Sequence, residues 1–591
     1  MDSYQNFHFS VFLTVGCVKK MFGEGSDPER EFNYYSKYTK FDKVYLECFR
    51  GEATPLDLLL RAKTFFEGRG VRTATAIMPS YSPQFDCSAR MLCFTNPEVR
   101  KLFSEYIASM AAYFDEIMID DSLATDCTCD RCRAAKGERS WQDFRTQLMT
   151  DFCRDAIVAP AKAVNPNVTI TLKYPTWHES FQALGYDTQT QPEMFDNIYS
   201  GTETRHTTYS LFRNPRYTSY SLIRYLQSLP PHNNRGGWFD SIQCANNMNY
   251  FCEQAEMTLL SNPEEMTLFC WSLNYDTMFL PALGYFCERT DRFLGELGKP
   301  RGIPVYLPHH SRGEDHVYDF LGMCGIPADP TVTFPQNPCV VLLTAASVCD
   351  PELISRVKAH LEKGGHVVVT SGCLEKLQDV GAGEFTAMRV AARSQSGSEF
   401  GGFDAGWSDD CAYYHSEHSI SMPVIEWMTN ENEFFAVQVR DASPNILLAR
   451  SWYSRGKLWV LNVPDSLSDY YAIPAPVMAY VRKYLSADLP VWMEGQNKIA
   501  IFPRDNNTVA VKSFLEHGSV VLLHVRGKST KLTSLVSGKV YTPYTQVSRS
   551  EQMFSDPANL TLPADEAAVE TVYRVVMEPL TLDAFRWEPA E

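Results

Sequence analysis

Short apolar runs alternate with amphipathic stretches through the first 300 residues of the chain. The runs are rich in β-branched and aromatic side chains, as buried strands are, and lie at 7–16, 43–48, 72–78, 116–121, 168–174, 197–200, 236–240 and 266–272. Between them, stretches such as 97–114 and 143–163 carry apolar residues at helical spacing. Eight strand and helix pairs predict a closed (β/α)8 TIM barrel, with an open doubly wound sheet as the alternative.

The pattern changes after residue 300. In 301–487, apolar runs at 340–344 and 366–370 flank an amphipathic stretch, 351–363, that ends at two glycines. This predicts parallel strands around a helix, in a flavodoxin-like or amidotransferase-like α/β domain. From 488 to 591, strand-like runs at 509–512 and 520–525 are separated by short polar turns, which predicts a small antiparallel β-domain, a β-sandwich. We therefore predict three domains, at 1–300, 301–487 and 488–591.

The charge balance disfavours polyanionic partners. The chain has 54 basic and 71 acidic residues and a net charge of −17, whereas phosphate binding requires clustered Lys and Arg. We therefore expect no nucleic acid and no membrane as partner. No window approaches 18 apolar residues and no leader pattern begins the chain, which predicts a soluble protein. The 17 cysteines, mostly scattered, fit a reducing cytoplasm better than a disulfide framework.

One group of cysteines is dense enough to bind a metal. Cys127, Cys129 and Cys132 form a Cys-x-Cys-x2-Cys cluster just beyond the fourth predicted strand, and Cys93 lies at the end of the preceding loop. Four thiolates make a tetrahedral zinc site, so we predict a structural Zn2+ that fixes these loops beside the mouth of the barrel. The alternative is a set of unpaired cysteines on a surface loop.

Acids, arginines and large aromatic side chains stand where the predicted strands end. The carboxyl ends of barrel strands meet at one face, where active sites lie. Carboxylates beside aromatic rings suit glycoside hydrolysis, in which one carboxyl protonates the leaving oxygen, a second attacks the anomeric carbon or activates water, and rings stack on sugar faces. The predicted catalytic residues are Asp120, Asp121, Glu203 and Asp240, and the predicted substrate-binding residues are Glu47, Arg50, Tyr174, His178, Arg205, Trp238 and Trp271.

Some of these residues also have a structural interpretation. Glu47 and Arg50, or Glu203 and Arg205, could be ion pairs that serve the fold alone. Trp271 could equally be a core residue.

The chain resembles the β-galactosidases of glycoside hydrolase family 42. That family places one cysteine before a Pro-x-x-Arg helix start, as Cys93 precedes Pro97 and Arg100, and three more after strand 4 in the spacing seen here. Trp271 also fits the position of the family's sugar-stacking tryptophan. The resemblance implies a catalytic barrel, an amidotransferase-like trimerisation domain, a small C-terminal β-domain, and assembly as a homotrimer.

The chain departs from that family at the catalytic positions. The family ends strand 4 in Asp-Asn-Glu, where the Glu is the acid/base, whereas this chain has Asp120-Asp121-Ser122, and the nucleophilic Glu of strand 7 is replaced by Asp240. We therefore expect a divergent relative without β-galactosidase activity. Two pairings remain: Asp121 as acid/base with Asp240 as nucleophile, or Asp120 or Asp121 as nucleophile with Glu203 as acid/base, as in α-galactosidase-type barrels. We favour the second.

The leading hypothesis is a cytoplasmic, retaining, exo-acting glycoside hydrolase that acts on short oligosaccharides or glycosides. A non-hydrolytic sugar-binding barrel is one alternative. The other is a lyase or isomerase whose carboxylates hold a divalent metal ion, because carboxylate oxygens are hard ligands that suit Mg2+ or Mn2+.

Overall fold

A computed structural model of the chain describes residues 3–79, 91–403, 412–429, 432–441, 443–548 and 569–590. The chain divides into two compact units, Met1–Gly295 and Glu296–Glu591. The first unit contains the predicted barrel. The second contains both the predicted α/β region and the predicted C-terminal β-region.

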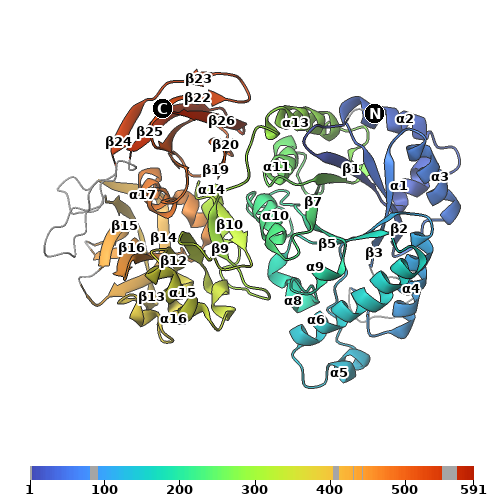
Figure 1. Ribbon diagram of the computed structural model, residues 1–591, viewed down its shortest axis with the longest axis horizontal. Coiled ribbons are helices and arrows are strands. Elements are labelled where there is room, and N and C mark those ends of the chain that lie inside the picture. The colour runs from blue at the N-terminus through green and yellow to red at the C-terminus, as the bar shows by residue number, and fades with distance from the viewer. Residues whose placement is uncertain are drawn as a thin grey trace. The chain divides into compact units, whose positions relative to one another are not determined.

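Eight parallel strands of the described residues close into a barrel in chain order, as the sequence predicts (Figure 1). Each predicted run coincides with a strand to within a few residues. The strands are β1 (His8–Leu13), β2 (Lys43–Arg50), β3 (Arg72–Met78), β4 (Glu116–Ile119), β5 (Thr169–Tyr174), β6 (Asn197–Gly201), β7 (Asn234–Asp240) and β8 (Glu265–Phe269).

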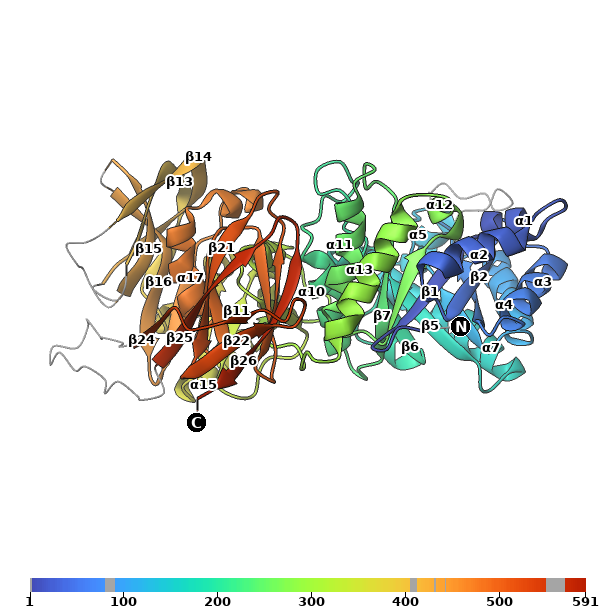
Figure 2. The same ribbon diagram turned by 90° about the horizontal axis from the view of Figure 1, so that it is seen from above.

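Helices surround the barrel, and α11 and α13 lie side by side outside it (Figure 2). The predicted helix 97–114 is α4 (Pro97–Ala111), which Asn96 caps by accepting a hydrogen bond from the Glu98 nitrogen. The predicted helix 143–163 is α6 (Trp141–Phe152) and α7 (Ala159–Val164), joined by a π-helical turn, Cys153–Val158. The other helices of this unit are α1 (Val15–Phe22), α2 (Pro28–Tyr38), α3 (Leu56–Glu67), α5 (Asp130–Lys136), the 3-10 turn His178–Ser180, α8 (Phe181–Leu184), α9 (Gln191–Met194), α10 (Thr218–Ser228), α11 (Met248–Leu259), α12 (Trp271–Asn274) and α13 (Phe279–Leu294).

Alternate residues of each barrel strand point inward, so one strand supplies both the interior and the layer under the helices. The interior is filled by a cluster of buried side chains: Phe12, Tyr45, Ala74, Ala76, Met118, Tyr199 and Trp238. A charged group at the N-terminal end of the barrel joins Lys43 to Glu116 at 2.7 Å and to Glu265 at 2.8 Å. The carboxyl ends of the strands are left to position the predicted site.

The second unit begins with a mixed sheet. Its described strands have the order β10-β9-β11-β12-β17-β16-β15-β13-β14. The predicted runs 340–344 and 366–370 form β11 (Val340–Leu343) and β12 (His366–Thr370), which pair in parallel around α15 (Leu353–Glu362) as expected. The other strands are β9 (Ile303–Tyr306), β10 (Ala328–Thr331), β13 (Met388–Gly402), β14 (Tyr413–Trp427), β15 (Asn432–Arg440), β16 (Ser443–Tyr453) and β17 (Gly456–Leu461).

The long strands β13–β16 are antiparallel and extend the sheet beyond its parallel half, which the sequence pattern did not predict. The helices of this region are α14 (Val317–Met323), α16 (Ser371–Leu377), α17 (Ala475–Leu485) and the 3-10 turns Ala345–Cys349, Ala382–Glu384 and Leu467–Ala472.

Two antiparallel sheets end the described chain, in agreement with the predicted β-domain. One has the order β18-β21-β25-β24 and the other β19-β20-β26-β22-β23, and a shared core that includes Ile501, Val511, Val521, Leu523 and Phe585 lies between them. The strands are β18 (Val491–Glu494), β19 (Ile499–Pro503), β20 (Thr508–Ser513), β21 (Ser519–Arg526), β22 (Ser529–Ser534), β23 (Val540–Tyr541), β24 (Thr545–Ser548), β25 (Val569–Met577) and β26 (Leu582–Pro589). Among the described residues, no helix is long and apolar enough to cross a membrane.

Candidate active site

The ends of β2 and β4 are joined by an arginine. Arg50 Nε lies 2.7 and 2.9 Å from the two carboxylate oxygens of Glu47, and its Nη2 donates to Asp120 Oδ2 at 2.9 Å. The Val15 nitrogen also donates to Glu47 Oε2, at 2.9 Å. Burial raises the pKa of Glu47 to about 7, against the opposing effect of the Arg50 guanidinium. Both carboxylate oxygens of Glu47 therefore have partners within the protein. Arg50, which pairs with Glu47, also orients Asp120.

A lysine on β5 lies at the centre of the predicted carboxylates. The fully buried Nζ of Lys173 is 3.0 Å from Glu203 Oε1, 3.1 Å from Asp121 Oδ1 and 3.6 Å from Asp120 Oδ1. It also stands 3.8 Å from the centroid of the Trp238 ring. Burial acts to lower the pKa of Lys173, but the carboxylates outweigh it and hold that pKa above its ordinary value. A permanent positive charge thus connects the ends of β4, β5 and β6.

Asp121 and Glu203 differ in the exposure of their side chains and in the surroundings of their carboxylate oxygens. The side chain of Asp121 is 33% exposed and that of Glu203 is 5% exposed. Burial, together with the charges of Asp120 and Glu203, raises the pKa of Asp121 to about 6 against the effect of Lys173. Glu203 Oε1 accepts from Lys173, whereas Glu203 Oε2 is buried and has no hydrogen-bond partner among the described residues. A buried acceptor without a partner is costly, which is typical of an atom that meets a ligand.

Both carboxylate oxygens of Asp240 accept hydrogen bonds from one arginine. Arg205 Nε donates to Asp240 Oδ1 at 3.0 Å and its Nη2 donates to Oδ2 at 2.6 Å, and the Ile242 nitrogen also donates to Oδ1. Bidentate pairing of this kind is the strong form of an ion pair. The sequence offered Arg205 as a partner of Glu203, but in the structure its partner is Asp240. Burial still raises the pKa of Asp240, with Arg205 opposing it.

Aromatic rings form the floor beneath these charges. Trp238 is 3% exposed, stacks on Phe269 with ring centroids 5.1 Å apart, and contacts Phe12 at 4.8 Å. The Arg50 guanidinium lies 5.4 Å from the Phe269 ring centroid. The Trp238 ring is therefore covered by Lys173 on at least one side, and the neighbouring Phe269 ring lies against Arg50.

Three predicted substrate-binding residues have other surroundings. The Tyr174 ring packs against Phe181 and Tyr186 on the helix side of β5. Trp271 is 1% exposed, stacks on Tyr35 at 3.8 Å and donates to Glu31 at 2.8 Å, so it is part of the packing. His178 lies on the turn after β5, with Nδ1 3.7 Å from the Glu179 carboxylate.

The sequence reasoning missed Lys173, the residue that brings the others together. The signal was present: Lys173 is the one charged residue in the run 168–174, at a position that alternates with Ile170 and Leu172. A lysine is almost never fully buried unless it is paired. A lysine at this position of a barrel strand therefore predicts acidic partners at the ends of the neighbouring strands.

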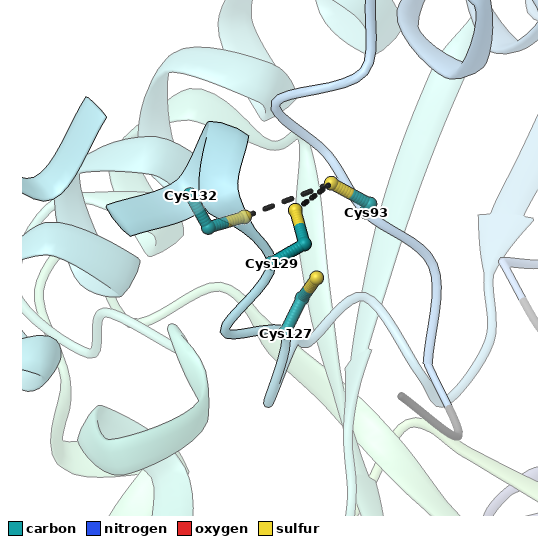
Figure 3. Close-up of side chains that lie close together, drawn as sticks. All are labelled: Cys93, Cys127, Cys129 and Cys132. Atoms are coloured by element: carbon teal, nitrogen blue, oxygen red, sulfur yellow. Dashed lines mark hydrogen bonds between the residues drawn. The ribbon is translucent and has the colours of Figure 1, made fainter. Parts of the chain in front are cut away.

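The four cysteines predicted to bind zinc converge in the structure. Their sulfur atoms all lie within 4.8 Å of one another and point toward a common centre (Figure 3). Cys93 Sγ is 3.7 Å from Cys129 Sγ and 3.6 Å from Cys132 Sγ, and all four are free thiols. Tetrahedral zinc with Zn–S bonds of about 2.3 Å separates its sulfurs by about 3.8 Å. The residues present therefore fit a tetrathiolate metal site.

Three family models match successive parts of the chain. Residues 1–279 match "Probable glycosyl hydrolase, catalytic domain", residues 298–466 match the second domain of "Uncharacterized protein SSO3021", and residues 490–587 match "Probable glycosyl hydrolase, C-terminal domain". Protein SSO3021 of Saccharolobus solfataricus is 24% identical in an alignment of 597 positions that covers 91% of this chain and 94% of that protein.

Solved structures share the whole fold. A catalytic mutant of Gan42B, a GH42 β-galactosidase from G. stearothermophilus, is 11% identical, with a TM-score of 0.65 and coverage of 99% of both chains. A β-galactosidase from Bacillus circulans sp. alkalophilus is 10% identical, with a TM-score of 0.64 and the same coverage. At these identities the likeness establishes the fold, and the resemblance predicted from the sequence is confirmed.

Proposed function

We propose that this chain, a divergent relative of the family 42 β-galactosidases, is a retaining, exo-acting glycoside hydrolase whose catalytic pair is Asp121 and Glu203. The match of residues 1–279 to a glycosyl hydrolase catalytic domain supports the reaction class. The observation that carries the pairing is the unpartnered Oε2 of the buried Glu203, together with the partly exposed Asp121, which contacts the same lysine.

Glu203 is the nucleophile in this proposal. Lys173 fixes Oε1, so Oε2 is free to attack the anomeric carbon. Asp121 is the acid/base, because a carboxyl with a pKa of about 6 still holds a proton for the leaving oxygen in mildly acidic solution. These roles reverse those favoured from the sequence. Asp240 is a poor nucleophile because Arg205 occupies both of its oxygens.

The two steps then follow from these positions. Glu203 Oε2 bonds to the anomeric carbon while Asp121 gives its proton to the departing oxygen, which leaves as an alcohol. Asp121, now a carboxylate, takes a proton from water, whose oxygen bonds to the anomeric carbon and releases Glu203. Because both carboxylates touch Lys173 Nζ, their nearest oxygens are at most about 6 Å apart, which favours retention over the wider spacing of inverting enzymes.

The position of Lys173 also bears on the metal-dependent alternative. Its ammonium group stands among Asp120, Asp121 and Glu203, where a divalent ion would stand in such a lyase or isomerase. The charge that the three acids need is thus supplied by the chain, which favours the glycosidase.

A screen against paired α- and β-linked nitrophenyl glycosides, in pyranose and furanose forms, tests the function. Wild-type protein should release nitrophenol from one anomer of at least one sugar, and Asp121→Asn should be slower on substrates with poor leaving groups by about 10²–10⁴-fold. Failure of wild-type protein on every substrate, and on short oligosaccharides, would count against hydrolysis.

The pH profile should report the protonation of Asp121. As an acid it works only when protonated, so kcat/KM should fall as pH rises through about 6 in the free enzyme. Asp121→Asn should lose this alkaline limb on a nitrophenyl glycoside, whose leaving group needs little protonation. An unchanged limb in Asp121→Asn would assign the acid to another residue.

The absence of a side chain at Gly201 leaves room for the Glu203 carboxylate. A Cβ at this position would lie 2.6 Å from Glu203 Oε2 and 2.8 Å from the Thr176 nitrogen. Gly201→Ala should therefore displace the carboxylate and lower kcat by about 10²-fold, the typical cost of a 1 Å misplacement. Gly237→Ala is the matched control, since its Cβ meets the Ile223 and Thr258 side chains instead. Equal losses of kcat in the two variants would contradict a specific effect on Glu203.

We further propose that Cys93, Cys127, Cys129 and Cys132 hold a structural zinc ion. The tetrathiolate would tie the loop before α4 to the segment that follows β4 and begins with Asp120 and Asp121. By likeness to the family 42 enzymes, we also propose a homotrimer. The mostly scattered cysteines support a cytoplasmic location, where it would act on short oligosaccharides or glycosides.

A further inference from the structure

Lys173 contacts both members of the proposed catalytic pair through one nitrogen. Its Nζ is 3.1 Å from Asp121 Oδ1 and 3.0 Å from Glu203 Oε1, and its side chain is fully buried. Among the described residues, neither acid forms another ion pair. Within the described part of the chain, Lys173 is thus the one cation in direct contact with the pair.

The other charges around this lysine have partners of their own. Asp120, 3.6 Å from Nζ, is paired with Arg50 at 2.9 Å, which also holds Glu47. Asp240 is paired with Arg205 at 2.6 Å. The Tyr186 hydroxyl group lies in the field of Asp120 and Asp121, where burial keeps its pKa well above the ordinary value, so it stays neutral. Removal of Lys173 would therefore leave the other ion pairs intact and expose Asp121 and Glu203 to each other.

We infer that Lys173 is a positioning residue that holds Asp121 and Glu203 in register and supplies the positive charge between their two carboxylates. This inference rests on the proposed function. The ammonium group fixes one oxygen of each acid, which leaves the other oxygen of Glu203 for substrate. It also offsets the mutual repulsion of two carboxylates about 6 Å apart or less, which would otherwise keep a proton on the pair to higher pH.

Loss of the Lys173 charge should change the shape of the pH profile as well as the rate. Lys173→Met keeps most of the length of the unbranched side chain and removes the charge. Its kcat should fall by about 10²-fold or more, and the acidic limb of kcat/KM should move up by about one pH unit or more. In Lys173→Ala, ethylammonium or propylammonium in the buffer should restore part of the rate and return the limb toward its wild-type position.

Lys43→Met is the matched control. Lys43 is a second buried lysine of the same barrel, paired with Glu116 and Glu265 at the opposite ends of the strands. Its loss should lower the melting temperature as the loss of Lys173 does, because both leave buried acids unpaired. It should not move the acidic limb. A limb that stays in place in Lys173→Met, or moves equally in Lys43→Met, would overturn the inference.

A second readout needs no catalysis. Water-soluble carbodiimides react with protonated carboxyl groups, so the pH dependence of labelling at the partly exposed Asp121, mapped by mass spectrometry, follows its ionisation. In Lys173→Met this labelling should persist to higher pH than in wild-type protein. If wild-type protein cleaves no glycoside but the labelling shifts, the proposed function fails and the role of Lys173 stands. If the labelling is unchanged, the role of Lys173 fails.

Discussion

Glu203→Gln is expected to lower kcat on the order of 10⁴-fold or more, with little change in the melting temperature. The amide keeps the shape of the side chain but cannot attack the anomeric carbon, and loss of a nucleophile is among the most damaging changes to an enzyme of this kind. The rate on the best nitrophenyl glycoside measures the loss, and thermal unfolding followed by circular dichroism checks the fold.

Azide rescue separates Glu203 from the competing nucleophile. Glu203→Gly should regain activity in sodium azide and produce a glycosyl azide, because the anion enters the space left by the carboxylate. Asp240→Gly should not respond, since Asp240 serves to hold Arg205. Azide rescue of Asp240→Gly alone would instead favour Asp121 as acid/base and Asp240 as nucleophile, the catalytic pair that the family 42 resemblance implied.

The zinc site should contribute strongly to stability. Purified protein is expected to contain one zinc ion per chain, and Cys132→Ser to lose it and melt at least about 5 °C lower, because a structural tetrathiolate site contributes folding free energy directly. Elemental analysis gives the stoichiometry, and calorimetry with and without a chelator gives the melting temperature.

Cys153→Ala provides the control for this prediction. Cys153 is a buried thiol in the π-helical turn after α6 and does not belong to the four-cysteine cluster. The Cys153→Ala protein should keep its zinc. A chelator should lower its melting temperature no more than it lowers that of the wild type. Protein that contains no zinc when purified without chelators, or Cys132→Ser protein that retains full stoichiometry, would refute the site.

The barrel was predictable because its strands are buried on both faces. Parallel strands of this kind read as continuous apolar runs, and each of the eight runs became a strand. The long antiparallel strands β13 and β14 were not predictable in this way. Half of β13 reads Arg-Ser-Gln-Ser-Gly-Ser-Glu, and many of its residues are exposed, so no apolar alternation marks it. Its pairing depends on backbone hydrogen bonds to neighbouring strands, which leave little trace in the sequence.

The candidate site was predictable as a set of residues but not as a set of contacts. The chain position of a strand end identifies which acids reach the mouth, and Asp121 and Glu203 were found in this way. It does not say which of two adjacent residues points inward. On β5 the choice fell on Tyr174, whose ring lies on the helix side, while the preceding Lys173 points into the barrel. Trp271 was placed by resemblance, but its ring is buried against Tyr35.

A trapped glycosyl-enzyme would identify the nucleophile directly. Wild-type protein is incubated with a 2-deoxy-2-fluoro glycoside of the sugar that the screen identifies, since the fluorine slows breakdown of the ester intermediate, and the labelled peptide is sequenced by mass spectrometry. We expect one fluorosugar per active site, esterified to Glu203. A label on Asp121 or Asp240, or turnover that gives inverted product without any label, would contradict this assignment.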